Sequence, residues 1–195
     1  ICGFLAYNWI GADIHKDADQ HMSQSDTGLV NYSWDRSIKG NRSDYEMNRR
    51  VISDIKMLRK EVDVVVLLPH WGYEFVNVPP YGLTLEAHSF IDAGVDLIIG
   101  SHPHVLQGME LYNNGMIFYS LGNFIFDMRA RHTRYTTILD IKVQENSIKS
   151  FSYEPFVINN DFQPIRATDA QKNHIKELID LSAAKITAPN RRELL

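Results

Sequence analysis

Two uninterrupted apolar runs dominate the hydrophobic pattern of the chain. Residues 62–68 (VDVVVLL) and 95–100 (VDLIIG) are rich in β-branched residues, which predicts strands buried on both faces of a parallel sheet. Between them, residues 83–94 predict a helix that ends at Gly94. Strand, helix and strand joined by short links form a βαβ unit, for which a right-handed crossover is expected. The apolar segment 1–7 predicts a further buried strand.

Segments on either side of this unit are also predicted to be helical. Ser43 and Glu46 form a capping-box pattern, and apolar residues recur at helical intervals after it, so we predict a helix over about 44–60. A second helix is predicted over about 168–183. The polar, irregular residues 8–44 predict a long loop, and loops of this length often carry function.

The second half of the chain alternates apolar and polar residues. Segments 106–112 and 116–122 flank Asn-Asn-Gly, a strong hairpin signal, and segments 135–144 and 147–158 flank Glu-Asn in the same way. These patterns predict antiparallel strands. Residues 1–195 are therefore expected to form a single α/β domain, in which a βαβ unit is followed by antiparallel strands.

Composition narrows the function classes. The formal net charge is −4, which excludes a global attraction for nucleic acid or anionic membranes. Residues 128–134 (MRARHTR) are the best candidate for a local basic patch. The single cysteine, Cys2, excludes an internal disulfide, and its predicted buried strand argues against a nucleophilic role. No apolar run reaches the roughly 18 residues of a membrane span. Because Ile1 already lies on a predicted strand, we expect the chain to be a fragment whose anchor or signal lay upstream.

Histidines follow both buried strands. His70 comes directly after the first strand, and His102 and His104 follow the second on either side of Pro103. Parallel strands end at one edge of a sheet, where ligands bind, so three imidazoles at this edge suggest a zinc, iron or manganese site. Spacing alone leaves hydrogen-bonded or solvated strand-end histidines as an equal alternative. Solvated or hydrogen-bonded roles are favoured for the remaining histidines, His15, His21, His88, His132 and His174.

Two polar residues are candidates to support this site. Glu74 lies four residues after His70 and is either a supporting hydrogen-bond partner or a surface residue. Asn123 lies in a Gly-bearing turn and either contacts the site or stabilises the turn. The side chains around them are expected to be structural, with Phe124 and Phe126 in the core, Asp127 and Arg129 on the surface, and Trp71 in either role.

Three sequence blocks resemble a known family in order and spacing. HWGYEF (70–75), IDAGVDLIIGSHPHVLQGMELY (91–112) and IFYSLGNFIFD (117–127) are similar to the bacterial capsule-synthesis CapA family, the poly-γ-glutamate biosynthesis group of the calcineurin-like metallophosphoesterase superfamily. The resemblance covers about residues 44–127. It implies a four-layer α/β/β/α sandwich, of which this chain would be the C-terminal part, lacking the N-terminal portion.

The resemblance also implies roles for the histidines. His70 and His102 would bind one ion of a two-metal centre, and His104 would bind the other. The superfamily's first half carries an Asp-x-His, a bridging Asp and an Asn-His, and residues 1–61 contain no convincing counterpart. The sequence Asp13-Ile14-His15 resembles Asp-x-His, but it does not follow an apolar strand directly, and we interpret it as a coincidence. The bridging Asp and the general acid or base are therefore expected upstream.

The resemblance implies a metal-dependent hydrolase of capsule or poly-γ-glutamate biosynthesis that cleaves a phosphoester or related bond. Its cofactors would be divalent ions of the manganese, iron or zinc class, two of them in the full-length parent. Its expected partners are other capsule synthesis proteins and the polymer, without nucleic acid, and its expected location is the extracellular face of the bacterial membrane. The alternatives are a non-catalytic scaffold of a synthesis or export complex with a degenerate metal site, and a structural zinc site.

Overall fold

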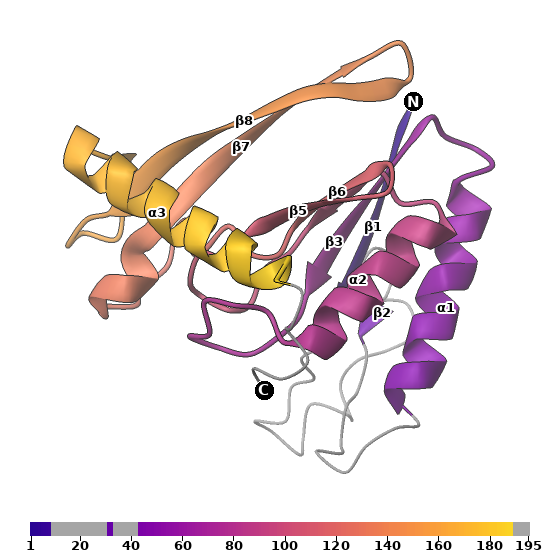
Figure 1. The fold of residues 1–195 in the computed structure, drawn as a ribbon, viewed down its shortest axis with the longest axis horizontal. Coiled ribbons are helices and arrows are strands. Elements are labelled where there is room, and N and C mark those ends of the chain that lie inside the picture. Colours follow the sequence, from indigo (N-terminus) through magenta and orange to yellow (C-terminus); the bar gives the residue numbers. More distant parts are fainter. Residues whose placement is uncertain (9–30, 33–42, 189–195) are drawn as a thin grey trace.

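A six-stranded sheet forms the centre of the molecule in a computed structural model that describes residues 1–8, 31–32 and 43–188 (Figure 1). The strand order is β2-β1-β3-β4-β6-β5, and neighbours pair in parallel except β5 with β6. The strands are β1 (Cys2–Asn8), β2 (Asn31–Tyr32), β3 (Val64–His70), β4 (Leu97–Ile99), β5 (Met109–Tyr112) and β6 (Gly115–Phe118).

Two helices cover one face of this sheet. They are α1 (Ser43–Leu58) and α2 (Tyr81–Ala93), which lie beside each other in Figure 1. Val51 and Ile55 of α1 and Phe90 of α2 join the buried cluster that contains Val65 and Leu67 of β3. The predicted βαβ unit is confirmed as β3-α2-β4, and α2 ends at Gly94, whose φ of 122° suits glycine.

A second, antiparallel sheet covers the other face. It contains β7 (Tyr135–Gln144), β8 (Ser147–Ile158) and β9 (Pro164–Arg166). Val64, Val66 and Phe118 of the large sheet pack against apolar side chains of β7 and β8, among them Leu139 and Phe151. Both predicted hairpins are confirmed, β5-β6 and β7-β8. The α/β class with a βαβ unit followed by antiparallel strands is therefore observed, consistent with a partial metallophosphoesterase-like domain.

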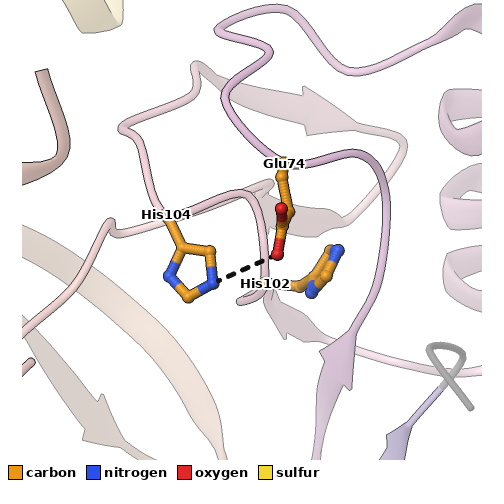
Figure 2. A group of neighbouring side chains, drawn as sticks. All are labelled: Glu74, His102 and His104. Atoms are coloured by element: carbon orange, nitrogen blue, oxygen red, sulfur yellow. Dashed lines mark ion pairs between the residues drawn. The ribbon is translucent and has the colours of Figure 1, made fainter. Parts of the chain in front are cut away.

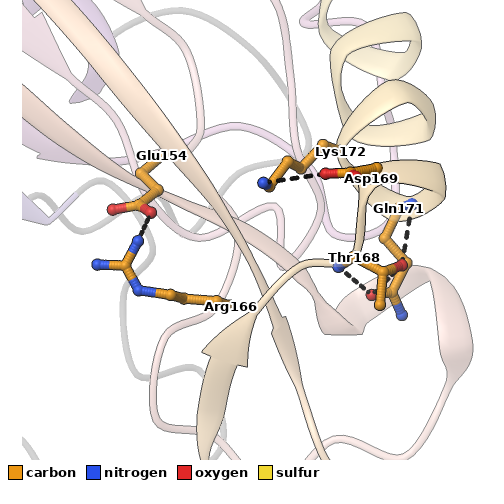
Figure 3. A network of polar contacts seen from close by, with 6 residues as sticks. All are labelled: Glu154, Arg166, Thr168, Asp169, Gln171 and Lys172. Atoms are coloured by element: carbon orange, nitrogen blue, oxygen red, sulfur yellow. Dashed lines mark hydrogen bonds and ion pairs between the residues drawn. The ribbon is translucent and has the colours of Figure 1, made fainter.

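Helix α3 (Asp169–Ile186) packs against β8 and β5. It starts with a capping box, in which the Thr168 backbone N–H donates to Gln171 Oε1 at 2.8 Å and the Gln171 N–H donates to Thr168 Oγ1 at 3.4 Å (Figure 3). Just before it, Arg166 of β9 pairs with Glu154 of β8. None of the helices in the described part of the chain is both long and apolar enough to span a bilayer.

Strand β1 was predicted to be buried, and this prediction is wrong for the side chains on one of its two faces. Cys2 is exposed, and Phe4 is 63% exposed. The β1–β3 register places these residues on the sheet face of Val64 and Val66. Among the described residues, the apolar cluster formed there by the second sheet does not include β1.

Other differences from the predicted elements are small. β3 runs two residues past its expected end, so that His70 is its last residue. The short strands β2 and β9 were not predicted, and β2 falls within the expected loop 8–44. Asp13, His15 and His21 lie outside the described residues.

The close contact of α3 with Gly108 gives a first prediction. A Cβ at Gly108 would lie 2.4 Å from the backbone nitrogen of Ala183. We therefore expect Gly108→Ala to lower the free energy of unfolding by about 1–3 kcal/mol, the usual cost of overpacking. Gly82→Ala is the control, because a Cβ at Gly82 in α2 meets nothing within 4 Å. Denaturant unfolding should show the control unchanged or up to about 1 kcal/mol more stable. Equal stability of the two variants would contradict the prediction.

Candidate metal centre

Backbone hydrogen bonds bring the two histidine-bearing segments together at the carboxyl edge of the sheet. His70, at the end of β3, forms a parallel bridge with Ser101. The Trp71 N–H donates to Ser101 O at 3.0 Å, and the Phe75 N–H donates to Pro103 O at 2.8 Å. The pairing of β3 with β4 thus continues beyond the strands and sets the distance between the segments.

Trp71 and Gly100 fix the base of the site. The Trp71 side chain is fully buried, and its Nε1–H donates to Tyr119 O at 3.1 Å. A Cβ at Gly100 would lie 2.1 Å from Tyr119 O and 2.4 Å from Trp71 Nε1, so only glycine fits there. Trp71, which sequence left open between core and site, therefore belongs to the core.

The turn that carries His102 and His104 is conformationally strained. Their φ angles are 100° and 58°, in a region that residues with a Cβ seldom occupy. Each such conformation costs about 1–3 kcal/mol and persists only where the surroundings impose it. Pro103 restricts the backbone between the two histidines. The directions of both imidazoles are therefore set by the fold rather than by free rotation of the chain.

His70 and His102 face each other closely. His70 Nε2 and His102 Nδ1 are 3.1 Å apart, and the rings meet edge to face. The Ser101 hydroxyl donates to Pro69 O at 3.4 Å, so its oxygen accepts from His70 Nδ1–H at 3.1 Å. This assignment leaves the lone pair of His70 on Nε2, where it accepts a hydrogen bond from His102 Nδ1–H in the metal-free protein.

Asn123 orients His104 through a chain of hydrogen bonds. The amide Nδ2 of Asn123 donates to Thr133 O at 3.1 Å, so its Oδ1 is the acceptor 2.7 Å from His104 Nδ1. His104 Nδ1 therefore carries the proton, and Nε2 keeps a lone pair. A hydrogen bond of this kind fixes the tautomer and ring direction of metal-binding histidines. The structure shows both roles expected for Asn123, because its side chain contacts His104 and also holds the loop that follows it through Thr133 O.

Glu74 reaches the same place from the loop after β3. Figure 2 shows its carboxylate beside His102 and His104, and Oε1 lies 3.8 Å from His104 Nε2. One ligand atom from each of the three residues lies within 4.8 Å of the others. The Glu74 side chain is 50% exposed, so it can adjust its position. This carboxylate, expected as a supporting group or as a surface residue, is a candidate ligand.

Burial keeps the rings neutral. It lowers the pKa of His70, with a further contribution from His104, and it lowers the pKa of His102 to about 4, helped by the neighbouring His70. Neutral imidazole is the form that binds a metal, so both rings are ready at neutral pH.

The spacing of the nitrogens fits a metal ion. Two nitrogens about 2.1 Å from one ion, at bond angles of about 90–109°, lie about 3.0–3.4 Å apart. The separation of 3.1 Å between His70 Nε2 and His102 Nδ1 is that of a hydrogen bond, and it also falls in this range, so a metal ion could replace the shared proton with little movement of the rings. The triad of Glu74, His102 and His104 is wider and requires a small movement of side chains to hold one ion. The donor set of imidazoles and one carboxylate suits zinc, iron or manganese.

Aromatic residues on the rim contradict one expectation. Phe124 and Phe126 are 44% and 41% exposed and do not lie in the core. They follow Gly122, whose φ of 75° turns the chain into a loop in which both side chains are exposed. The Phe126 ring centroid lies 4.9 Å from that of His104. We predicted burial from the hydrophobicity of these side chains. Hydrophobicity does not reveal which parts of the surface other segments of the fold will cover.

The remaining predicted residues fall outside the centre. Asp127 and Arg129 are exposed, as expected. His88 lies 3.0 Å from Glu110, and the exposed His174 packs its ring edge-on against Tyr135. Thr133 was not foreseen as a member of the site, because it contributes a backbone carbonyl, for which no sequence motif exists.

Comparisons with known proteins agree on one family. The family model described as "Bacterial capsule synthesis protein PGA_cap" matches residues 2–128. The chain is similar to "PGA biosynthesis protein CapA" of Bacillus subtilis, with 38% identity over 126 residues, 64% of this chain and 33% of the relative. It is similar to "Capsule biosynthesis protein CapA" of Bacillus anthracis, with 33% identity over 123 residues, 63% of this chain and 30% of the relative.

A shorter match extends the comparison to Mycobacterium tuberculosis. Its "Probable polyglutamine synthesis accessory protein" is 31% identical over 65 residues, 33% of this chain and 17% of the relative. The matched part of the chain spans about a third of the length of the two Bacillus relatives.

The hydrogen-bond chain through Asn123 gives a second prediction. We expect Asn123→Ala to remove the preference of His104 for a proton on Nδ1, which ¹⁵N NMR of the imidazoles in metal-free protein measures directly. Affinity for added zinc or manganese should fall about 10- to 100-fold, as for other partners that orient metal-binding histidines. Asn173→Ala, on the exposed side of α3, is the control and should change neither quantity. An unchanged His104 tautomer in Asn123→Ala would refute the assignment.

Proposed function

The chain belongs to the bacterial capsule synthesis protein family PGA_cap, and on this basis we propose that its histidine centre is a metallophosphoesterase-type site that hydrolyses a phosphoester or related bond during poly-γ-glutamate or capsule biosynthesis. The observation that carries the proposal is the separation of 3.1 Å between His70 Nε2 and His102 Nδ1. Two neutral imidazoles held at this distance have the spacing of ligands to one divalent ion.

Each member of the centre has a proposed task. His70 and His102 would hold one ion, while His104 would offer its Nε2 lone pair to a second ion with Glu74 beside it. A bound divalent ion would lower the pKa of a water molecule and neutralise negative charge on the substrate. Asn123 keeps the His104 lone pair directed into the site. Partial burial lowers the pKa of His70 and of His102, which limits competition from protons at these two rings at neutral pH.

The centre needs a further carboxylate for two-metal chemistry. Within residues 1–8, 31–32 and 43–188, Glu74 is the one acidic residue grouped with the histidines. We propose that residues 1–195 are part of a metallophosphoesterase-like domain in which another segment of the full-length protein supplies the bridging carboxylate and the general acid or base. The proposed location is the extracellular face of the bacterial membrane, and the proposed partners are the polymer and other synthesis proteins.

A non-catalytic scaffold in a capsule synthesis or export complex is the second candidate. The observation that favours it is the same limited carboxylate set, because three histidines and one half-exposed Glu74 could bind a metal ion without forming a complete two-metal site. The name of the mycobacterial relative, an accessory protein, also supports it. The two candidates differ in whether the metal-loaded full-length protein hydrolyses an ester.

Removing two histidines tests the proposal. We expect the double variant His102→Ala with His104→Ala to lose bound metal and all phosphoesterase activity in the full-length protein, measured by elemental analysis and with a chromogenic phosphodiester. His174→Ala, an exposed histidine on α3, is the control and should retain both. Unchanged metal content in the double variant would overturn the ligand assignment. Metal bound by the wild type without hydrolysis of phosphomonoesters or phosphodiesters would favour the scaffold.

Neutralising Glu74 tests its role as a ligand. We expect Glu74→Gln to weaken zinc or manganese binding about tenfold or more, because the amide keeps the shape but loses the charge beside His104. Glu177→Gln, an exposed residue of α3, makes the same charge change elsewhere and should bind metal as the wild type does. Isothermal titration with each metal measures the difference, and equal affinities for the two variants would exclude Glu74 from the centre.

A further inference from the structure

The basic segment 128–134 is anchored to the histidine centre. Its 3₁₀ helix spans Arg131–Arg134. Asn123 joins the two directly, because its Nδ2 donates to Thr133 O at 3.1 Å while its Oδ1 accepts from His104 Nδ1 at 2.7 Å. One buried side chain therefore orients a candidate ligand and holds the basic segment.

A second contact joins the segment to the centre through ring packing. The His132 ring meets Phe75 edge to face, with centroids 5.8 Å apart. Phe75 in turn lies over His104, with centroids 6.1 Å apart. The backbone contact of Thr133 and the ring contact of His132 are independent of each other, and Arg131 adjoins His132 in the 3₁₀ helix that they hold beside the site.

The cations of the segment differ in whether they are already engaged. Arg134 donates to Asn160 Oδ1 at 2.7 Å, and the Arg129 guanidinium lies 5.3 Å from the Phe162 ring centroid. Arg131 is exposed, and within the described part of the chain it has no hydrogen-bond or ion-pair partner. A guanidinium presents paired donors that match carboxylate and phosphate oxygens. Arg131 is therefore free to bind an anion.

We propose that Arg131, with an N–H donor from His132, forms an anion-binding subsite that holds a carboxylate or phosphate group of the ligand at the histidine centre. The idea of a shared ligand rests on the proposed function, whereas binding of the anion itself does not require a metal. A weakly acidic chain, with a net charge of −4, repels polyanions as a whole, so a local subsite of this kind is needed to hold one.

Anion titrations of metal-free protein test the subsite. Isothermal titration in EDTA would use a γ-linked glutamate oligomer as the carboxylate probe and inorganic phosphate as the phosphate probe. Loss of one charge-assisted contact should weaken binding of at least one probe about tenfold in Arg131→Gln. Lys142→Gln is the matched control, because it removes the same charge from an exposed residue of β7. A selective effect on the oligomer assigns a carboxylate ligand, and a selective effect on phosphate assigns a phosphate.

Four results would overturn the inference. The first is that the wild type binds neither probe, and the second is that Arg131→Gln and Lys142→Gln lose affinity equally. The third is that Arg131→Gln weakens binding only to vesicles of anionic lipid. The fourth is that Arg131→Gln loses metal, which would indicate a structural role. Failure of the proposed function is distinguishable. If the variant lacking His102 and His104 keeps its metal but Arg131→Gln still loses anion affinity, the subsite stands without the metal centre.

Discussion

The register between β3 and β4 is the constraint on which the candidate centre depends. Parallel pairing aligns Leu67 with Ile98 and continues as the bridge between His70 and Ser101. A slip by one residue would turn the buried side chains of β3 to the opposite faces of the sheet, and His70 would turn with them. The burial of apolar side chains between two layers therefore also sets the position of the candidate metal-binding side chains. Strand pairing is enough to bring the ends of β3 and β4 together, and no separate interaction is needed for this.

Beyond the strand ends, the positions of His102 and His104 are set by close packing and polar contacts instead of strand pairing. Gly100 lets the Tyr119 carbonyl and the Trp71 indole approach each other, and their hydrogen bond locks the base of the turn. His102 and His104 occupy unfavourable backbone conformations above this base. The strain is tolerated because bonds such as that from the Phe75 N–H to Pro103 O leave the turn few alternatives. The imidazoles are thus directed before any ligand arrives.

The sequence predicted the parts of this arrangement that depend on local pattern. Continuous apolar runs identified β3 and β4, and their ends identified His70, His102 and His104 as neighbours, because parallel strands share an edge. The errors have a different cause. Phe4 and Phe126 are as hydrophobic as buried residues, but no described layer covers them, and coverage is a property of the whole fold. Likewise, the proton position on His104 follows from the Thr133 carbonyl, which no side-chain pattern reveals.

The centre separates its neutral and charged components. The ligand rings emerge from the sheet edge, where burial lowers the pKa values of His70 and His102 and keeps them uncharged. The positive charge comes from the loop after β6, where Arg131 is exposed to solvent. Water and salt screen its repulsion of a cation at the histidines, whereas direct contact with an anion does not depend on a long-range field. Asn123 contacts both parts, so a site of this kind can hold a cation and an anionic ligand together without either displacing the other.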